Sequence, residues 1–163
     1  NSNSGAIARA QDEGIPSVHL SSATHPDPQD LDRAIRDALV AHDVELVLLV
    51  GYMKKIGPLT LTEYEGRILN IHPALLPKFG GRGMYGSRVH ETVIASGVTE
   101  TGITIHVVDS KYDHGPIVAQ CRLPVLANDT PITLAHRVLE REHSFLVETD
   151  SGIVEGEIAL PTS

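Results

Sequence analysis

The sequence is poor in cysteine, in long apolar runs and in net positive charge. Cys121 is the only cysteine among 163 residues, which excludes a disulfide within the chain and a cysteine-rich metal cluster. No run of residues resembles a signal segment or is long enough to cross a membrane. The formal net charge of −8 provides no general attraction to nucleic acid. We therefore expect a cytoplasmic protein with neither a membrane nor a nucleic acid as partner.

Metal-binding motifs and repeats are also missing. The chain holds nine histidines, but none lie in the His-x-x-x-His spacing of zinc enzymes, so we expect no metal site. There is no internal repeat and no low-complexity linker. With 41% hydrophobic residues, the chain is long enough for one core, and we predict a single domain over residues 1–163.

Helical and strand patterns alternate along the chain, as in α/β proteins. Apolar residues recur with the helical period from Leu31 to Leu39, and Glu45–Val50 is a continuous apolar run of the kind found in strands covered on both faces. The remaining predicted helices are 6–10, 59–64, 87–96 and one that starts at Thr130, and the remaining predicted strands are 17–20 (weak), 68–71, 101–108 and 117–125. Together these patterns predict an α/β fold.

The segment Asn70–Pro77 carries the clearest chemical signal. Asn70 and His72 stand two residues apart at the end of a predicted strand, so both side chains face the same side. Asp113 lies in a loop between two predicted strands, which we expect to be an antiparallel connection. An amide, an imidazole and a carboxylate together can stabilise an oxyanion and transfer a proton.

Other polar residues have structural and functional interpretations of similar weight. Glu142 falls near the centre of an apolar stripe on the last predicted helix, so it either meets a cation or amide within the fold or faces a ligand cavity. His106 alternates with apolar neighbours and is expected to pack or bond locally. Five basic residues form a candidate anion-binding patch around the Asn70–Pro77 segment: Lys54, Lys55, Lys78, Arg82 and Arg88.

With these motifs in view, the chain resembles the phosphoribosylglycinamide formyltransferase family, within the wider group of folate-dependent formyltransferases. The resemblance runs from Asn1 to about Leu160. It is carried by four segments in combination: Asn70–Lys78, Gly83–Gly86, Thr101–His106 and Tyr112–Ile117.

The resemblance implies a fold and a set of site residues. The fold would be a Rossmann-like formyltransferase fold, a mostly parallel sheet with helices on both faces. Asn70, His72 and Asp113 match the catalytic residues of the family, and Glu142 matches a residue that contacts the glycinamide substrate. The residues that match the folate site are Met53, Lys54, Ile56, Asn70, Val108, Asp109, Tyr112 and Asp113.

The family transfers a formyl group from 10-formyltetrahydrofolate to the amine of glycinamide ribonucleotide, a step of purine biosynthesis. By resemblance, Asn70 and a protonated His72 would stabilise the oxyanion, while Asp113 would favour the imidazolium and relay the proton. No metal is required, and the sequence leaves open whether the protein forms a homodimer. Two related activities stay as alternatives, formyltetrahydrofolate hydrolase and methionyl-tRNA formyltransferase, and so does an inactive folate-binding or interaction module.

The chain departs from the family pattern in two places. Asn1–Ser4 matches the segment that follows the second strand of the family, so the N-terminal strands and the phosphate-binding loop are missing. We therefore expect an incomplete member with a narrowed sheet and impaired binding of glycinamide ribonucleotide. The second departure is Asp150-Ser151-Gly152, which we expect to fray the end of the last helix.

Overall fold

The computed structural model describes residues 4–161, so most of the Asn1–Ser4 segment lies outside the described residues. The chain divides into two compact units, which are described separately here. The first comprises residues 1–44 and 56–63, and the second comprises residues 45–55 and 64–163. This division does not test the prediction of a single domain over 1–163, which stays a prediction.

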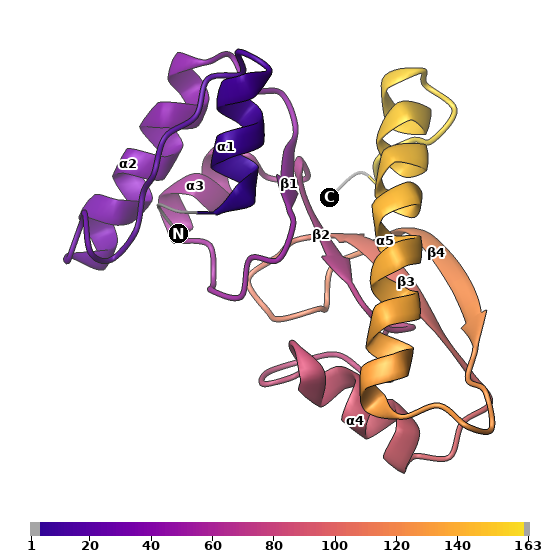
Figure 1. Ribbon diagram of the computed structural model, residues 1–163. Helices are drawn as coiled ribbons and strands as arrows, with labels where there is room; N and C mark the ends of the chain where they lie inside the picture. The colour runs from indigo at the N-terminus through magenta and orange to yellow at the C-terminus, as the bar shows by residue number, and fades with distance from the viewer. Residues whose placement is uncertain (1–3, 162–163) are drawn as a thin grey trace. The chain divides into compact units, whose positions relative to one another are not determined.

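The first unit is helical, and aspartate side chains bind the backbone N–H groups at the starts of its second and third helices. Its helices are α1 (Gly5–Asp12), α2 (Pro28–Ala41) and α3 (Pro58–Glu63), as predicted from the helical period (Figure 1). Asp27 caps α2 by accepting the first free N–H groups of the helix. The buried carboxylate of Asp32 accepts the N–H groups of Leu59 and Thr60 and the hydroxyl of Thr60. Asp32 therefore ties the start of α3 to α2.

The strand predicted at Ser17–Leu20 is not formed. These residues have no regular secondary structure, and 62% of the Val18 side chain is exposed. A short extended segment is stable only when a neighbouring strand satisfies its backbone hydrogen bonds. No strand pairs with this segment in the described part of the chain, so the prediction was wrong here.

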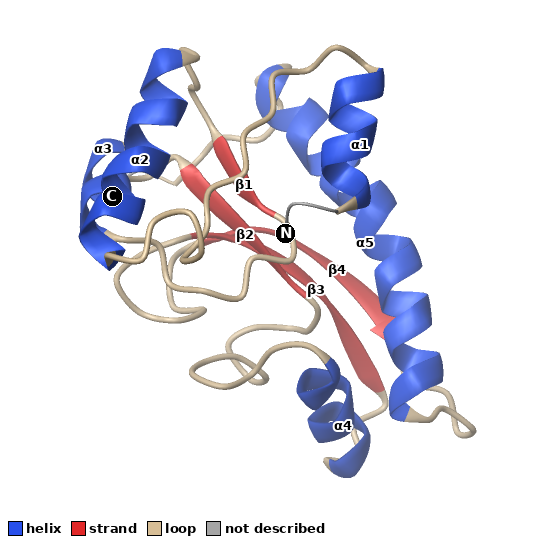
Figure 2. Cartoon of the chain, turned by 60° about the vertical axis from the view of Figure 1, so that its left-hand side comes forward, coloured by secondary structure: helices blue, strands red, loops and turns tan. Residues whose placement is uncertain are grey.

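The second unit contains a four-stranded sheet and two helices. The strands are β1 (Val47–Leu49), β2 (Ile68–His72), β3 (Glu100–Val107) and β4 (Ile117–Pro124), and the helices are α4 (Ser87–Ala95) and α5 (Pro131–Val154). The strand order is β1-β2-β3-β4 (Figure 2). The α/β class is confirmed, but the sheet is mixed rather than mostly parallel, because only β1 and β2 run parallel and the other two pairs are antiparallel.

Strand β1 is one of the two edge strands of this sheet and is shorter than predicted. The apolar run Glu45–Val50 was expected to be covered on both faces, yet the β1 side chains are only half-buried and Val50 is 61% exposed. The sheet ends at β1 among residues 4–161. A continuous apolar run indicates that a strand can be buried, but neighbouring elements decide whether it is.

The two faces of the β2–β3 pair differ in chemistry. On one face Leu69 pairs with Val107 and Ile71 pairs with Ile105, and these side chains join the core with α4 and α5. Successive side chains alternate between faces. The opposite face therefore carries a polar set, made of Asn70 and His72 on β2 and their partners His106 and Thr104 on β3.

Helix α5 runs to Val154 and buries the predicted apolar stripe at Val138 and Phe145 but not at Leu139. Leu139 was expected on the buried stripe but is 49% exposed, whereas the deeply buried positions are Leu134, Val138, Phe145, Thr149 and Gly152. The helix does not fray at Asp150–Gly152. The carbonyl of Gly152 accepts the N–H groups of Glu157 and Ile158, and the Ile158 side chain packs over the glycine. Gly152 thus allows the chain to fold back against α5.

Among the described residues, no helix has the length and apolarity needed to cross a membrane.

Candidate active site

Asn70 lies on the polar face of β2, and its amide is held by a histidine. The Nδ1 atom of His106 lies 2.9 Å from the carbonyl oxygen of Val107. Since a carbonyl only accepts, Nδ1 donates to it, and in the tautomer protonated at Nδ1 the other nitrogen, Nε2, is an acceptor. The Nδ2 group of Asn70 lies 3.1 Å from this Nε2 and donates to it. His106 thereby fixes the orientation of the Asn70 amide, which keeps a second N–H group for another acceptor.

His72 is buried at the end of β2 and bonds to a backbone carbonyl. Its Nε2 atom lies 2.7 Å from the carbonyl oxygen of Phe79, so Nε2–H is the donor. Its Nδ1 atom faces Asp113, with 3.7 Å between Nδ1 and Oδ1. Burial lowers the pKa of His72 below its ordinary value, although the charge of Asp113 and the Phe79 carbonyl oppose this effect. Burial thus disfavours the protonated His72 that the resemblance implied, whereas the charge of Asp113 favours it.

Asp113 completes the cluster from the loop between β3 and β4. Its Oδ2 atom accepts the N–H of Gly81 at 2.9 Å, and its Oδ1 atom lies 3.6 Å from Nε2 of His106. Burial alone would raise the pKa of Asp113, but the neighbouring His106 and His72 rings and the Gly81 N–H lower it overall. Asp113 is therefore an ionised carboxylate beside the His72 and His106 rings. The structure thus brings Asn70, His72 and Asp113 together, as predicted from the sequence.

Sequence reasoning missed three parts of this cluster. His106 was expected to bond locally, but it also contacts Asn70 and Asp113. The carbonyl of Phe79 and the N–H of Gly81 hold His72 and Asp113 through backbone atoms, which no residue pattern reveals. For His106 a signal was present, since its position opposite Asn70 follows once two antiparallel strands are assumed.

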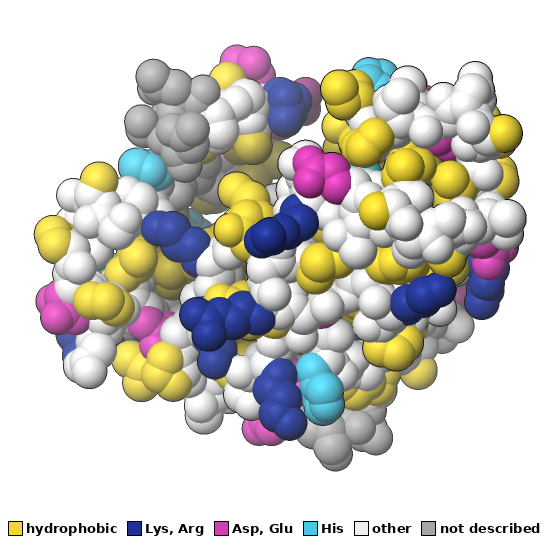
Figure 3. Space-filling model, turned by 90° about the horizontal axis from the view of Figure 1, so that it is seen from below, with side chains coloured by type: hydrophobic (Ala, Val, Ile, Leu, Met, Phe, Trp, Pro, Cys, Tyr) yellow, Lys and Arg dark blue, Asp and Glu magenta, His cyan; other side chains and the backbone are white. Residues whose placement is uncertain are grey.

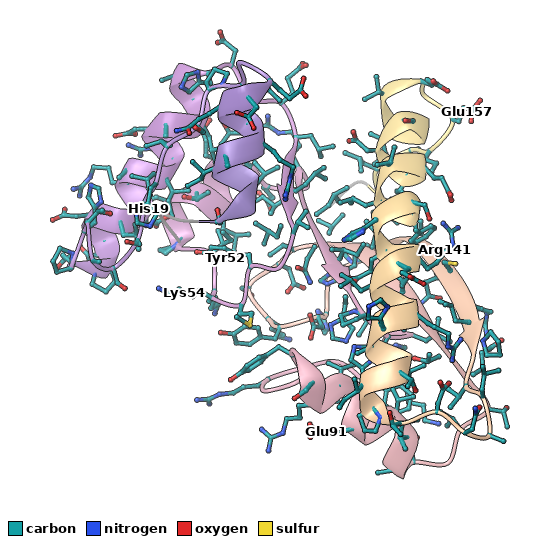
Figure 4. All side chains as sticks on the ribbon, in the orientation of Figure 1. His19, Tyr52, Lys54, Glu91, Arg141 and Glu157 are labelled. Atoms are coloured by element: carbon teal, nitrogen blue, oxygen red, sulfur yellow. The ribbon has the colours of Figure 1, made fainter. Side chains whose placement is uncertain are left out.

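The residues predicted to bind folate differ in exposure. Met53 is 65% exposed and Tyr112 is 46% exposed, whereas Val108 and Asp109 are half-buried. Lys54 is exposed on the loop after β1, where Figure 4 labels it beside Tyr52. Ile56 is buried and belongs to the first unit. Because β1 runs parallel to β2 and Leu49 is level with Asn70, the loop after β1 leaves the sheet at the same edge as His72.

The predicted basic patch consists of exposed side chains, since all five residues are exposed. On the face shown in Figure 3, Lys and Arg side chains stand in separate groups among hydrophobic and neutral ones. Within residues 4–161, no group of three or more His, Cys, Asp or Glu side chains is arranged to hold a metal ion.

Glu142 is half-buried on α5 and has no ion-pair or hydrogen-bond partner among the described residues. The cation or amide that was one of the two expectations is thus not provided by the fold. Burial raises the pKa of Glu142 to about 7. A carboxylate in this situation gains stability from any cationic or hydrogen-bond-donating group that approaches it.

The fold and the cluster together define an α/β protein whose site is equipped to stabilise an oxyanion and to move a proton. The chain belongs to the formyl transferase family, because the profile of the family described as "Formyl transferase" matches residues 2–149.

Individual relatives agree with this membership. The chain is 44% identical over 155 residues to the chloroplastic phosphoribosylglycinamide formyltransferase of Arabidopsis thaliana, an alignment that covers 94% of this chain and 53% of that protein. It is 38% identical over 139 residues to the phosphoribosylglycinamide formyltransferase of Bacillus subtilis, covering 85% of this chain and 69% of that protein.

A solved structure of similar fold is glycinamide ribonucleotide transformylase 1 from Symbiobacterium toebii. The TM-score is 0.88 with 34% sequence identity, and the match covers 99% of this chain and 74% of that chain. The chain thus spans about half the length of the plant relative and about three quarters of this solved structure.

Proposed function

We propose that this chain carries the catalytic half of a phosphoribosylglycinamide formyltransferase, which moves a formyl group from 10-formyltetrahydrofolate to the amine of glycinamide ribonucleotide in purine biosynthesis. The observation that carries the proposal is the clustering of Asn70, His72 and Asp113 on the polar face of the β2–β3 pair. The names of the relatives supply the substrate class.

Asn70 supplies the oxyanion donor. Attack of an amine on a formyl carbon places negative charge on the formyl oxygen. One N–H of the Asn70 amide is bound to Nε2 of His106, and this bond aims the second N–H of the same amide. Because the donor is oriented before the reaction begins, little reorganisation is needed when the charge develops.

His72 and Asp113 accept the proton that leaves the attacking amine. When the tetrahedral intermediate collapses, the bond between the formyl carbon and N10 of the folate breaks, and the same proton passes to N10, so that tetrahydrofolate leaves. Nδ1 of His72 and Oδ1 of Asp113 lie 3.7 Å apart, so a proton gained by either group is stabilised by the other. A proton gained at Nδ1 makes His72 an imidazolium whose new N–H faces Asp113. The negative charge of Asp113 favours this imidazolium against the effect of burial.

The residues beside the cluster suit a folate co-substrate. The flat, largely apolar pteridine ring needs apolar contact together with a few hydrogen bonds. Exposed apolar side chains, Met53 after β1 and Tyr112 after β3, provide such surface on the two loops next to the polar face. The co-substrate would supply the formyl group, and Asn70 and Asp113 would face its reacting end.

Glu142 is proposed to contact the glycinamide part of the nucleotide. It has no partner within the described residues, and its pKa of about 7 reflects the cost of ionising a half-buried carboxyl group. An amine or amide N–H from the substrate would provide the missing partner.

The test is a product assay on the 163-residue chain with 10-formyltetrahydrofolate, with and without glycinamide ribonucleotide. We expect a formylated nucleotide, detected by mass spectrometry, that forms only when the nucleotide is present. Asp113→Asn should lower kcat by ~10²–10⁴-fold, the usual contribution of a proton-transfer group, while the exposed matched control Asp12→Asn should not. Release of formate at the same rate without the nucleotide would instead indicate the hydrolase activity, and a lack of both products would indicate an inactive folate-binding module.

A further inference from the structure

Asp113 occupies a backbone conformation that its loop must enforce. Its φ angle is +53°, and Asp43 is the only other described residue besides glycine with a positive φ. Residues other than glycine adopt this left-handed region only rarely, aspartate and asparagine more often than most. The Asp113 carboxylate also has to stay within reach of Gly81 on one side and His72 on the other.

The base of the loop is fixed by backbone contacts. The N–H of Val107 donates to the carbonyl of Pro116 at 2.8 Å. Gly115 packs so closely on this base that an added Cβ atom would lie 1.9 Å from the Val107 carbonyl oxygen. These contacts close the loop at its ends, but none of them acts on the residues between 108 and 114.

Inside the loop, the side chains of Asp109 and His114, on either side of Asp113 in the sequence, form a hydrogen bond with each other. The Nδ1 atom of His114 lies 2.8 Å from Oδ2 of Asp109, and because a carboxylate only accepts, His114 donates this hydrogen bond. The other oxygen of Asp109 accepts the N–H of Lys111 at 2.7 Å. Burial alone would raise the pKa of Asp109, but the His114 bond and the Lys111 N–H lower it, so the pair is held as an ionised acceptor and its donor.

We propose that Asp109 and His114 are positioning residues, whose hydrogen bond holds the preceding residue Asp113 in its left-handed conformation and so keeps the carboxylate directed at Gly81 and His72. This inference rests on the proposed formyl transfer. His114 directly follows Asp113 in the chain, so anchoring its side chain to Asp109 restricts the backbone on the C-terminal side of Asp113. The resemblance placed Asp109 in the folate site; its contacts here give it a role within the loop.

The Asp109–His114 hydrogen bond contributes more to the position of Asp113 than to the stability of the fold. His114 is 62% exposed and Asp109 is 35% exposed, and exposed pairs of this kind contribute little to folding. A displacement of about 1 Å at a catalytic group can nevertheless cost up to about 10²-fold in rate. Loss of the pair should therefore reduce turnover while leaving the fold intact.

Three variants test the proposal. His114→Leu removes the donor, and His114→Asn keeps one, because Nδ2 of asparagine lies close to the place of Nδ1 in histidine. His136→Leu is the matched control, an exposed histidine on α5 whose Nδ1 lies 3.7 Å from Oε1 of Glu140. We expect His114→Leu to lower kcat by roughly 10-fold with KM for 10-formyltetrahydrofolate changed by less than about 2-fold. His114→Asn should restore most of kcat, and His136→Leu should have the wild-type value.

A second readout does not depend on activity. The carboxyl ¹³C resonance of Asp113, followed by NMR against pH, should report a higher pKa in His114→Leu than in the wild type, because the carboxylate loses its fixed contacts with Gly81 and the histidines. If the wild type transfers no formyl group, the proposed function fails and this titration alone decides the positioning role. An Asp113 titration identical in His114→Leu and wild type would overturn the proposal, whatever the value of kcat.

Discussion

The protonation of His72 is set by two opposing effects. Burial lowers its pKa, and the charge of Asp113 raises it. Removing the charge in Asp113→Asn should therefore lower the pKa of His72 further, as measured from the imidazole proton resonances by NMR. The exposed control Asp12→Asn should leave the titration of His72 unchanged. A His72 pKa that rises in Asp113→Asn would show that Asp113 does not act on the ring through its charge.

Glu142 should make the protein less stable as pH rises. Its pKa is about 7 in the folded chain and near 4.5 in the unfolded chain, so the folded state binds the extra proton between these values. Stability is then greatest below about pH 4.5 with respect to this group and falls until the pH passes 7, by ~1–2 kcal/mol once solvent screening at the half-exposed site is allowed for.

Urea denaturation of Glu142→Gln at several pH values measures this contribution. The variant should lack the decline between pH 4.5 and 7 that the wild type shows. Glu140→Gln, an exposed position on the same helix, should keep it. An equal decline in Glu142→Gln and wild type would contradict the raised pKa.

At the scale of elements, the loop between β3 and β4 depends on close backbone packing. Gly115→Ala would place a Cβ atom 1.9 Å from the Val107 carbonyl oxygen, so the loop must move away from the strand. We expect a loss of ~1–3 kcal/mol in the free energy of unfolding, typical of an overpacked site. Ser110→Ala in the same loop should change stability by less than about 0.5 kcal/mol, since Ser110 is exposed.

Circular dichroism with urea unfolding compares the two loop variants directly. Gly115→Ala should also lower formyl transfer, because Asp113 lies in the loop that is displaced. Equal stability of Gly115→Ala and Ser110→Ala would mean that the loop relaxes at no cost and that its packing does not position Asp113.

The helices and strands that the sequence predicted best are those that are determined by residues within or next to the element itself. Helix α2 has both the 3.6-residue period and Asp27 as a capping residue, and β2 ends at two prolines. The errors occur where distant residues decide the outcome. Residues 17–20 have strand character but no partner strand, and the end of α5 is held by Ile158 packing on Gly152. The exposure of Leu139 depends likewise on which elements cover the helix.

At the scale of the whole molecule, the candidate site was predicted in its members but not in its arrangement. The two-residue spacing of Asn70 and His72 correctly placed both side chains on one face. The antiparallel pairing with β3 is what brings His106 opposite Asn70, and it requires knowledge of the strand order. The lowered pKa of His72 depends on burial by the surrounding residues, so no short motif could reveal it.

The most direct test of the proposed catalytic cluster is the rate of formyl transfer by Asn70→Ala. Its matched control is Asn128→Ala, an asparagine in the exposed turn before α5. If Asn70 supplies the oxyanion donor, its loss should lower kcat by ~10²–10³-fold, the usual effect of removing one such donor. The Asn128 variant should retain the wild-type rate. Wild-type turnover in Asn70→Ala, with the variant folded and the nucleotide as acceptor, would contradict the assignment of this cluster as the catalytic site.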